Sequence, residues 1–205
     1  MLRLLCALAL SVLSAGCALM TEAIDIPYRS TGAAPPVLGA GAATVSVVGT
    51  DARTSRQDRV STKKNHYGVE MAPITAANDI PQTVADGIRQ ELAAEGYRIG
   101  PGHAQVHVDV IKFYSDFNTG ILSSAANAEV ALGVTVLTAA NLIIYGRYYA
   151  ATGTGTGALV TSGPAARAAL VSALGKAVHR IVSDPGFEHA VLRAQASRST
   201  EIEFR

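Results

Sequence analysis

The spacing of hydrophobic residues predicts four strands and two helices in this chain of 205 residues. Apolar and polar residues alternate at Thr44–Val48, with many β-branched side chains, so this segment is expected to be a strand. Three further strands are expected at Ala104–Phe113, Ala126–Leu137 and Leu142–Thr152. Short turns join these three strands, and this favours an antiparallel meander.

Apolar residues at helical spacing predict the two helices. The first helix has an apolar residue at every fourth position: Val84, Ile88 and Leu92. Asp79 is expected to cap its start and Gly96 to end it, because glycine readily takes the left-handed conformation after a last turn. The second helix is expected to begin after Ser162 and to end near Asp184, with a short helical continuation at Phe187–Arg193.

The beginning of the chain has the pattern of a bacterial export leader. Arg3 gives it a positive start, and residues 4–12 form an apolar run that is too short for a membrane span of about 20 residues. Small residues then lead from Leu13 to Cys17. This segment resembles the lipobox of bacterial lipoproteins, in which the cysteine receives a diacylglycerol and the leader is removed. The resemblance implies a signal peptide at residues 1–16 and a lipid anchor on Cys17.

The alternative is an ordinary secretory leader that is cut after Ala15 or Gly16 and leaves Cys17 without lipid. If the lipid is attached, two or more acyl chains hold the protein on a membrane almost permanently. Ala18 stands where an aspartate commonly marks retention at the inner membrane in enteric-type envelopes. By resemblance to that sorting rule, the expected location is the periplasmic face of the outer membrane.

Proline and glycine are frequent in the segment that follows Cys17, and no hydrophobic period persists there. Residues 17–43 are therefore expected to be the lipidated cysteine and a flexible tether. A periplasmic α+β domain is expected at residues 44–195, followed by a polar tail at residues 196–205.

A polar and basic stretch follows the first expected strand. Asp51 and Arg53 are two residues apart at the end of that strand, so both side chains are expected to point to one side. They either belong to a recognition patch or pair with their neighbours and fix the loop that follows. The possible interaction patch consists of six residues: Asp51, Arg53, Arg56, Arg59, Lys63 and Lys64.

Charge and cysteine content narrow the possible functions. Lys and Arg total 17 against 16 Asp and Glu, so the chain has no general attraction for nucleic acid phosphates. The cysteines are Cys6, inside the leader, and Cys17. The mature domain is therefore expected to lack disulfides, zinc-thiolate sites and nucleophilic cysteine chemistry.

The sequence contains no arrangement of residues typical of a catalytic site. The glycine-rich tract Gly153–Gly157 is not followed directly by a helix start with a Lys-Ser/Thr pair. It is therefore interpreted as a flexible strand end or bulge rather than a phosphate loop. His107 and Asp109 share a strand face, either as surface polar residues or as a weak metal or acid/base pair. We predict no enzyme activity, no cofactor and no metal site.

Several short motifs occur one after another along nearly the whole mature chain. They are Cys17, Val45-x-Val47, Asp51-x-Arg53, Asn65-x-Tyr67-Gly68, Leu92-x-x-x-Gly96-Tyr97, the valine strand that follows, and Tyr148. In these motifs the chain resembles the YajG-like family of bacterial envelope lipoproteins. The glycine tract and the alanine-rich last helix are not part of the resemblance. The family implies a small periplasmic domain on an outer-membrane anchor, with no established enzymatic activity.

The expected fold is α+β, with two layers: a mainly antiparallel sheet of about four strands and two helices on one face, in the order β-α-β-β-β-α. The leading function hypothesis is a non-catalytic interaction or accessory module that docks another envelope protein or itself. The alternative is a periplasmic carrier or sensor that binds a lipid or glycan fragment. A lined apolar cavity would favour the carrier, and a solid core with an exposed apolar or edge-strand patch would favour docking.

Overall fold

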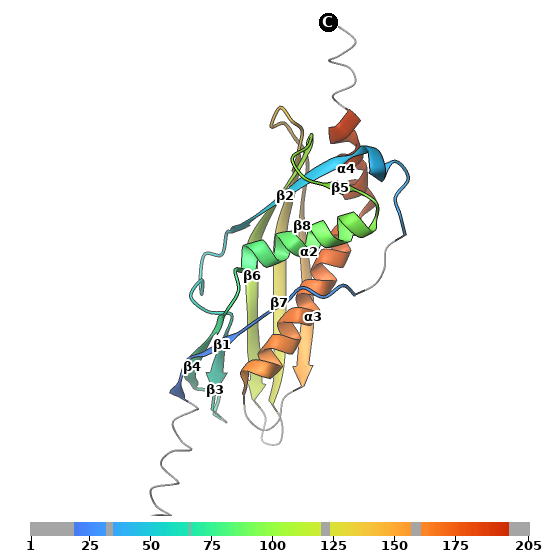
Figure 1. Cartoon of the computed structure of the whole chain (residues 1–205). Coiled ribbons are helices and arrows are strands. Elements are labelled where there is room, and N and C mark those ends of the chain that lie inside the picture. The colour runs from blue at the N-terminus through green and yellow to red at the C-terminus, as the bar shows by residue number, and fades with distance from the viewer. Residues whose placement is uncertain (1–18, 32–34, 66, 120–123, 157–160, 197–205) are drawn as a thin grey trace, which may run out of the picture.

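In the described part of the chain, a mixed sheet of eight strands is covered on one face by three α-helices (Figure 1). The computed structural model describes residues 19–31, 35–65, 67–119, 124–156 and 161–196. The expected signal peptide, Cys17 and residues 197–205 of the expected polar tail lie outside the described residues. The α+β class is confirmed, but the expected sheet of about four strands is wrong.

The centre of the sheet is β6 (Ala104–Thr119), which pairs along most of its length with β7 (Ser124–Leu137). β7 in turn pairs with β8 (Ile143–Thr156), and both pairings are antiparallel. The predicted meander is therefore confirmed, with longer strands than the alternation indicated. The face toward the helices is apolar and at most 1% exposed at Val106, Val108, Val110, Val130, Leu132, Val134 and Val136.

The other edge of β6 is built from two strands in succession. β2 (Thr44–Asp51) runs parallel to the first half of β6 and confirms the first predicted strand. β3 (Ser61–Lys64) continues beside the second half, where Ser61 pairs with Ser115. Residues 52–60 therefore leave the sheet between two strands that follow the same edge.

The remaining three strands complete this side of the sheet. β4 (Glu70–Ala76) is antiparallel to β3, β1 (Glu22–Ile24) is parallel to β4, and β5 (Arg98–Ile99) is parallel to β2. The sheet is thus mixed rather than mainly antiparallel. Sequence reasoning missed β1, β3, β4 and β5 because they are short, carry little apolar alternation, and in β4 include Pro73.

The segment expected to be a tether belongs in part to the fold. β1 lies within it, and Ile24 and Ile26 are only 6% and 0% exposed. The Asn78 side chain accepts a hydrogen bond from the N–H of Ile26 and donates one to its carbonyl oxygen, both at 3.0 Å. A 3₁₀ helix, η2 (Ala40–Ala42), then leads into β2. The folded part of the protein therefore begins well before residue 44.

Helix α2 (Ile80–Ala94) is the first predicted helix, and its two ends are as expected. The Asp79 carboxylate accepts a hydrogen bond from the N–H of Gln82 at 2.8 Å and caps the first turn. Gly96 has a φ of 99°, the left-handed conformation that follows a last turn. The predicted stripe is fully buried: Val84, Ile88 and Leu92 are each 0% exposed.

Helices α3 (Gly163–Val182) and α4 (Pro185–Ala196) confirm the second predicted helix and its continuation. The glycine-rich tract is where α3 meets β8. A Cβ atom on Gly153 would lie 2.2 Å from the carbonyl oxygen of Ala169, and one on Gly155 would lie 2.1 Å from that of Ala165. The described part of the tract is therefore a closely packed strand, not the flexible strand end or bulge that the sequence indicated.

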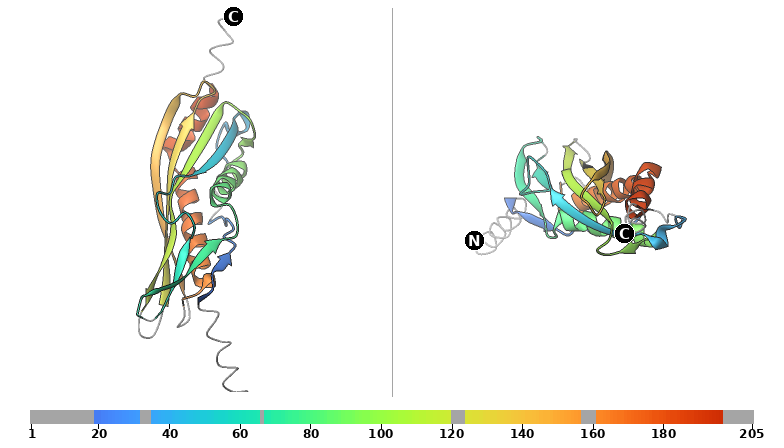
Figure 2. Two further views of the ribbon diagram at one scale, coloured as in Figure 1. Left: turned by 90° about the vertical axis from the view of Figure 1, so that its left-hand side faces the viewer. Right: turned by 90° about the horizontal axis from the view of Figure 1, so that it is seen from above.

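All three α-helices lie on one face of the sheet, and the opposite face is open (Figure 2). None of the helices in the described residues is both long and apolar enough to cross a bilayer. The molecule is elongated along β6. We call the end with β1, β3 and β4 the β1 end, and the end with β5, α4 and the turn at residues 138–142 the α4 end (Figure 1).

Candidate interaction surfaces

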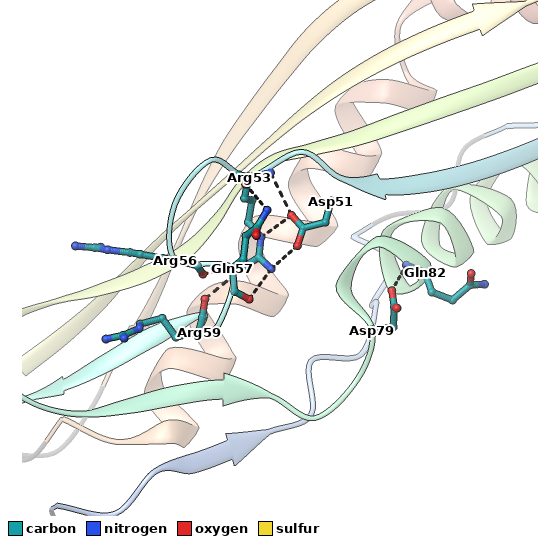
Figure 3. A network of polar contacts seen from close by, with 7 residues as sticks. All are labelled: Asp51, Arg53, Arg56, Gln57, Arg59, Asp79 and Gln82. Carbon is teal, nitrogen blue, oxygen red and sulfur yellow. Dashed lines mark hydrogen bonds and ion pairs between the residues drawn. The ribbon is translucent and has the colours of Figure 1, made fainter.

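Asp51 and Arg53 form a two-pronged ion pair at the end of β2 (Figure 3). The Nε and Nη2 atoms of Arg53 lie 2.8 and 2.7 Å from the two carboxylate oxygens of Asp51. The backbone N–H of Arg53 donates to the same carboxylate at 3.2 Å. The side-chain hydrogen bonds from Arg53 lower the pKa of Asp51 and outweigh the opposite effect of burial. Charge-assisted bonds of this kind are the strongest that such side chains make.

Arg53 is only 8% exposed and holds the loop of residues 52–60 from the inside. Its guanidinium donates to the carbonyl oxygens of Arg56, Gln57 and Arg59 at 3.4, 3.2 and 3.4 Å. The Gln57 amide donates back to the carbonyl oxygen of Arg53 at 2.5 Å. This geometry is the one that the loop-fixing alternative requires, because the guanidinium points into the loop (Figure 3). Binding of a partner by the six-residue patch stays a prediction.

The four other basic residues of the expected patch also have local partners. These are the Tyr114 ring for Arg56 (4.2 Å to the centroid), Asp58 for Arg59 (2.8 Å), Glu22 for Lys63 (3.0 Å) and Asp116 for Lys64 (2.5 Å). Three of the four partners are carboxylates, so the positive charges are largely compensated where they stand. The basic residues of the expected patch therefore do not produce a strong positive potential that would attract an acidic partner.

A hollow of about 270 Å³ separates the loop from the start of α2. Arg53 and Asp58 line it on one side, and Asn78 to Pro81 line it on the other. The first turn of a helix attracts anions through its N–H groups. Here the carboxylate of Asp79 already occupies that position, so the hollow offers little to an external anion.

A larger groove of about 410 Å³ follows the outer edge of β2, toward the α4 end. It is lined by Ser46, Val47, Arg89, Ile99, Gly100, Pro101, Gly102 and Gln105. β5 pairs with β2 only at Thr44 and Val45, and in the described residues no strand pairs with that edge beyond Val45. Gly102 allows the chain to cross the start of β2, because a Cβ there would lie 2.1 Å from the carbonyl oxygen of Thr44.

Arg89 covers this open strand edge. Its guanidinium donates to the carbonyl oxygen of Val47 and pairs with Asp86 one turn earlier in α2. A charged side chain over an edge strand limits unwanted strand pairing. Sequence reasoning missed the groove. The signal that could have found it is Gly100-Pro101-Gly102, a turn between strands that lie on opposite sides of β2.

Two buried acids lie one turn apart near the end of α2. Glu91 and Glu95 are each 3% exposed, and the hydroxyl of Tyr28 donates to Glu91 at 2.5 Å. Burial raises the pKa of Glu95 to about 7, and Glu188 and Glu91 add to the rise. Burial also raises the pKa of Tyr97, whose hydroxyl has no hydrogen-bond partner among the described residues. Ionisation of Glu95 is therefore expected to be unfavourable for the packing at the end of α2.

Comparison with known proteins identifies the family to which the chain belongs. A model of the family Lipoprotein_16, described as an uncharacterized lipoprotein, matches residues 35–191. The protein belongs to this family. The YajG-like resemblance is thereby confirmed, and membership in a lipoprotein family implies a lipid anchor. No curated protein matches the chain.

A solved structure shares the fold of this lipoprotein at low sequence identity. Protein XCC0632 from Xanthomonas campestris is 16% identical, with a TM-score of 0.59, and the match covers 86% of this chain and 99% of that one. A minor lipoprotein from Acinetobacter baumannii is 10% identical, with a TM-score of 0.41, over 76% and 96% of the two chains. The first similarity shows the fold alone, and the second is too weak to support an argument.

Proposed function

We propose that this lipoprotein is anchored in the outer membrane through Cys17 and acts as a non-catalytic docking module of the cell envelope. Its partner is another envelope protein or a second copy of the chain. The observation that carries the proposal is the groove along the outer edge of β2, where Arg89 covers the carbonyl oxygen of Val47. An extended segment of a partner can displace Arg89 and add to the sheet as a further strand.

The packing of the core supports docking over the carrier alternative. A carrier of lipid or glycan fragments needs an enclosed, mostly apolar pocket. Here α3 lies directly on β8 at Gly153 and Gly155, which leaves no space between helix and sheet at those positions. The groove itself is open to solvent and mixes the polar side chains of Ser46, Arg89 and Gln105 with apolar and glycine residues, so it is not an enclosed, mostly apolar pocket.

In-cell photo-crosslinking tests the docking proposal. A photoreactive amino acid replaces Ser46 on the groove rim of the full chain, and Thr152, exposed on the open face of β8, serves as the matched control. We expect a protein adduct from position 46 that is absent from position 152. The substitution Arg89→Ala should raise the adduct yield, because it removes the side chain that a docking strand must displace.

Two results would contradict the docking proposal. Recovery of only small-molecule adducts from position 46 would favour the carrier alternative. Equal protein adducts from positions 46 and 152 would mean that the groove has no preference for a partner. The anchor is tested separately by intact-mass analysis and membrane fractionation. We expect an acylated chain that begins at Cys17 in the outer-membrane fraction, and its release into the soluble fraction in Cys17→Ser.

A further inference from the structure

Large apolar side chains are exposed in two segments at the β1 end. Leu19 and Met20, just before β1, are 63% and 66% exposed. Tyr67 and Val69, in the turn between β3 and β4, are 79% and 56% exposed, and Met71 at the start of β4 is 37% exposed. Neighbouring exposed apolar residues can mark a contact surface. Leu142 and Ile143 at the α4 end are also 64% and 69% exposed, and the β1 end differs from it in lying next to the expected anchor.

The two segments lie next to each other. β1 and β4 run parallel, with Glu22 opposite Ile74, so the residues before Glu22 lead back toward the beginning of β4. The Lys63 ammonium donates to the carbonyl oxygen of Met20 at 3.2 Å, and Lys63 pairs with Ala72 across the β3–β4 hairpin. Met20 is therefore held beside the hairpin that carries the exposed turn.

The turn between β3 and β4 is held in place by hydrogen bonds. The Asn65 side chain accepts from the N–H groups of Tyr67 and Val69, each at 3.0 Å. Gly68 completes the turn with a φ of 81°, and its N–H donates to the carbonyl oxygen of Asn65 at 2.9 Å. The backbone N–H groups of Tyr67, Gly68 and Val69 are thus all hydrogen-bonded to Asn65, while the side chains of Tyr67 and Val69 are exposed.

The expected lipid attachment point is within a short reach of this surface. Only Ala18 lies between Cys17 and Leu19. An extended residue spans at most about 3.6 Å, so the two Cα atoms are no more than about 7 Å apart. Because β1 is part of the sheet, no long spacer separates the folded part from a lipid on Cys17.

We propose that the surface formed by Leu19, Met20, Tyr67, Val69 and Met71 rests in the headgroup region of the bilayer that holds the anchor. This inference depends on the lipid anchor of the proposed function and adds an orientation to it. Amphipathic surfaces of this kind sink about 5–10 Å into the boundary between headgroups and acyl chains. The 16 residues of β6 span about 50 Å, so the α4 end and the β2 groove face away from the membrane.

The charges at the β1 end point to apolar contact rather than attraction to anionic lipid. Lys63 pairs with Glu22, and Lys64 pairs with Asp116, at 3.0 and 2.5 Å. Basic residues whose charge is compensated in this way add little binding to a negative surface. The contact of this surface with the bilayer should therefore change little when the fraction of anionic lipid changes.

Depth-dependent fluorescence quenching tests the orientation. The full lipidated chain is reconstituted into vesicles of phosphatidylethanolamine and phosphatidylglycerol that contain a spin-labelled lipid. Cys6 lies in the leader and Cys17 carries the thioether, so Tyr67→Cys introduces one thiol for an environment-sensitive dye. Leu142→Cys is the matched control, because Leu142 is 64% exposed in the turn at the α4 end. We expect a blue shift and several-fold stronger quenching at position 67 than at position 142.

Each outcome of this experiment tests either the proposed orientation or the lipid anchor. Equal quenching at both positions would mean that the molecule lies flat or has no fixed orientation, and this would overturn the inference. Weak quenching at both positions, with the protein still bound to the vesicles, would also overturn it. Protein that does not float with the vesicles would instead refute the anchor, so failure of the two proposals is distinguishable. Repeating the measurement without phosphatidylglycerol should leave the quenching at position 67 unchanged.

Discussion

The two sides of β6 are held by different kinds of interaction. On one side, β7 and β8 follow each other in sequence and are covered by α3 through residues with small side chains or none, such as Gly155 and Ala165. On the other side, β2 and β3 are separated by a loop that Arg53 fixes, and Arg89 covers the strand edge. Close backbone packing occurs on both sides, since a Cβ on Gly49 of β2 would lie 2.2 Å from the carbonyl oxygen of Pro81. The β2 side differs in adding these polar contacts to the packing of α2.

Among the described residues, the outer edges of both β8 and β2 include stretches without a strand partner. Along β8, Lys176 and Arg180 of α3 donate to the carbonyl oxygens of Thr152 and Ala150. Along β2, the pairing with β5 ends at Val45, and the Arg89 guanidinium covers the carbonyl oxygen of Val47 beyond it. A hydrogen bond from a side chain such as Arg89 can be exchanged for a hydrogen bond from a partner at little net cost. A packed helix cannot be displaced so readily.

The largest effect is expected on the packed side, from Gly155→Ala. The new Cβ would lie 2.1 Å from the carbonyl oxygen of Ala165, so α3 has to move away from β8. Overpacking of this kind should lower the free energy of unfolding by about 2–3 kcal/mol. Urea denaturation followed by circular dichroism measures the change.

Gly146→Ala in the same strand is the matched control, because a Cβ at that position meets nothing within 4 Å. It should change the free energy of unfolding by no more than about 0.5 kcal/mol. Equal effects of the two substitutions would show that α3 does not depend on glycine in β8, and the contrast between the two sides would be lost.

On the polar side, the largest effect is expected from Arg53→Met. The substitution removes the side-chain donors to the Asp51 carboxylate and to three loop carbonyl oxygens. Removing one partner of such a network should cost about 2 kcal/mol. The measurement is again urea denaturation, supplemented by limited proteolysis of the loop at residues 52–60.

Arg59→Ala serves as the control on the same loop. The Arg59 side chain pairs with Asp58 at the surface, so its loss should have no measurable effect on stability. If Arg53→Met leaves both the stability and the protease resistance of the loop unchanged, Arg53 does not hold the loop, and its role as part of a recognition patch becomes the better explanation.

The same contrast decides how much of the fold the sequence could predict. The meander, α2 and α3 were predicted because their patterns are local: valines alternate in β6, and Val84, Ile88 and Leu92 repeat at helical spacing in α2. β1 and β3 were missed because each consists of three or four residues that become strands only through distant partners. Their pairing with β4 and β6 has no signature in composition.

The candidate sites show the same limit. The side chains of Asp51 and Arg53 lie together as the spacing predicted, because residues two apart on a strand share a face. The groove was not predicted, since it requires knowing that β5 ends after Ile99 and leaves the edge of β2 open. The burial of Glu91 was missed for a similar reason: it depends on Tyr28, 63 residues earlier in the chain.

A smaller, pH-dependent effect is expected from Glu95→Gln. The folded state holds the pKa of Glu95 at about 7, above its ordinary value of 4.5, so the folded protein binds this proton more tightly than the unfolded chain does. The corresponding stability is complete below pH 4.5 and is lost as the pH rises to about 7. The variant should lack this decline and be more stable than the parent protein at pH 8.

Thermal unfolding at pH 4.5, 6 and 8 checks this prediction. Glu129→Gln is the control, because Glu129 is half exposed on the open face of the sheet and pairs with Lys112. If Glu95→Gln and the parent protein lose stability in parallel across these pH values, Glu95 is not the group that makes the end of α2 sensitive to pH.

The smallest effect is expected from Glu22→Gln, which weakens a surface contact at the β1 end. Glu22 pairs with Lys63 at 3.0 Å and accepts a hydrogen bond from the N–H of Gly163 at 3.3 Å, so it joins β1 to β3 and to the start of α3. A partly exposed pair contributes about 0.5 kcal/mol, and salt screens it. The loss should therefore shrink in 1 M salt, in contrast to the salt-independent loss in Gly155→Ala. A large loss that persists in 1 M salt would place Glu22 among the buried polar contacts, and the β1 end would then depend on charge as strongly as the loop depends on Arg53.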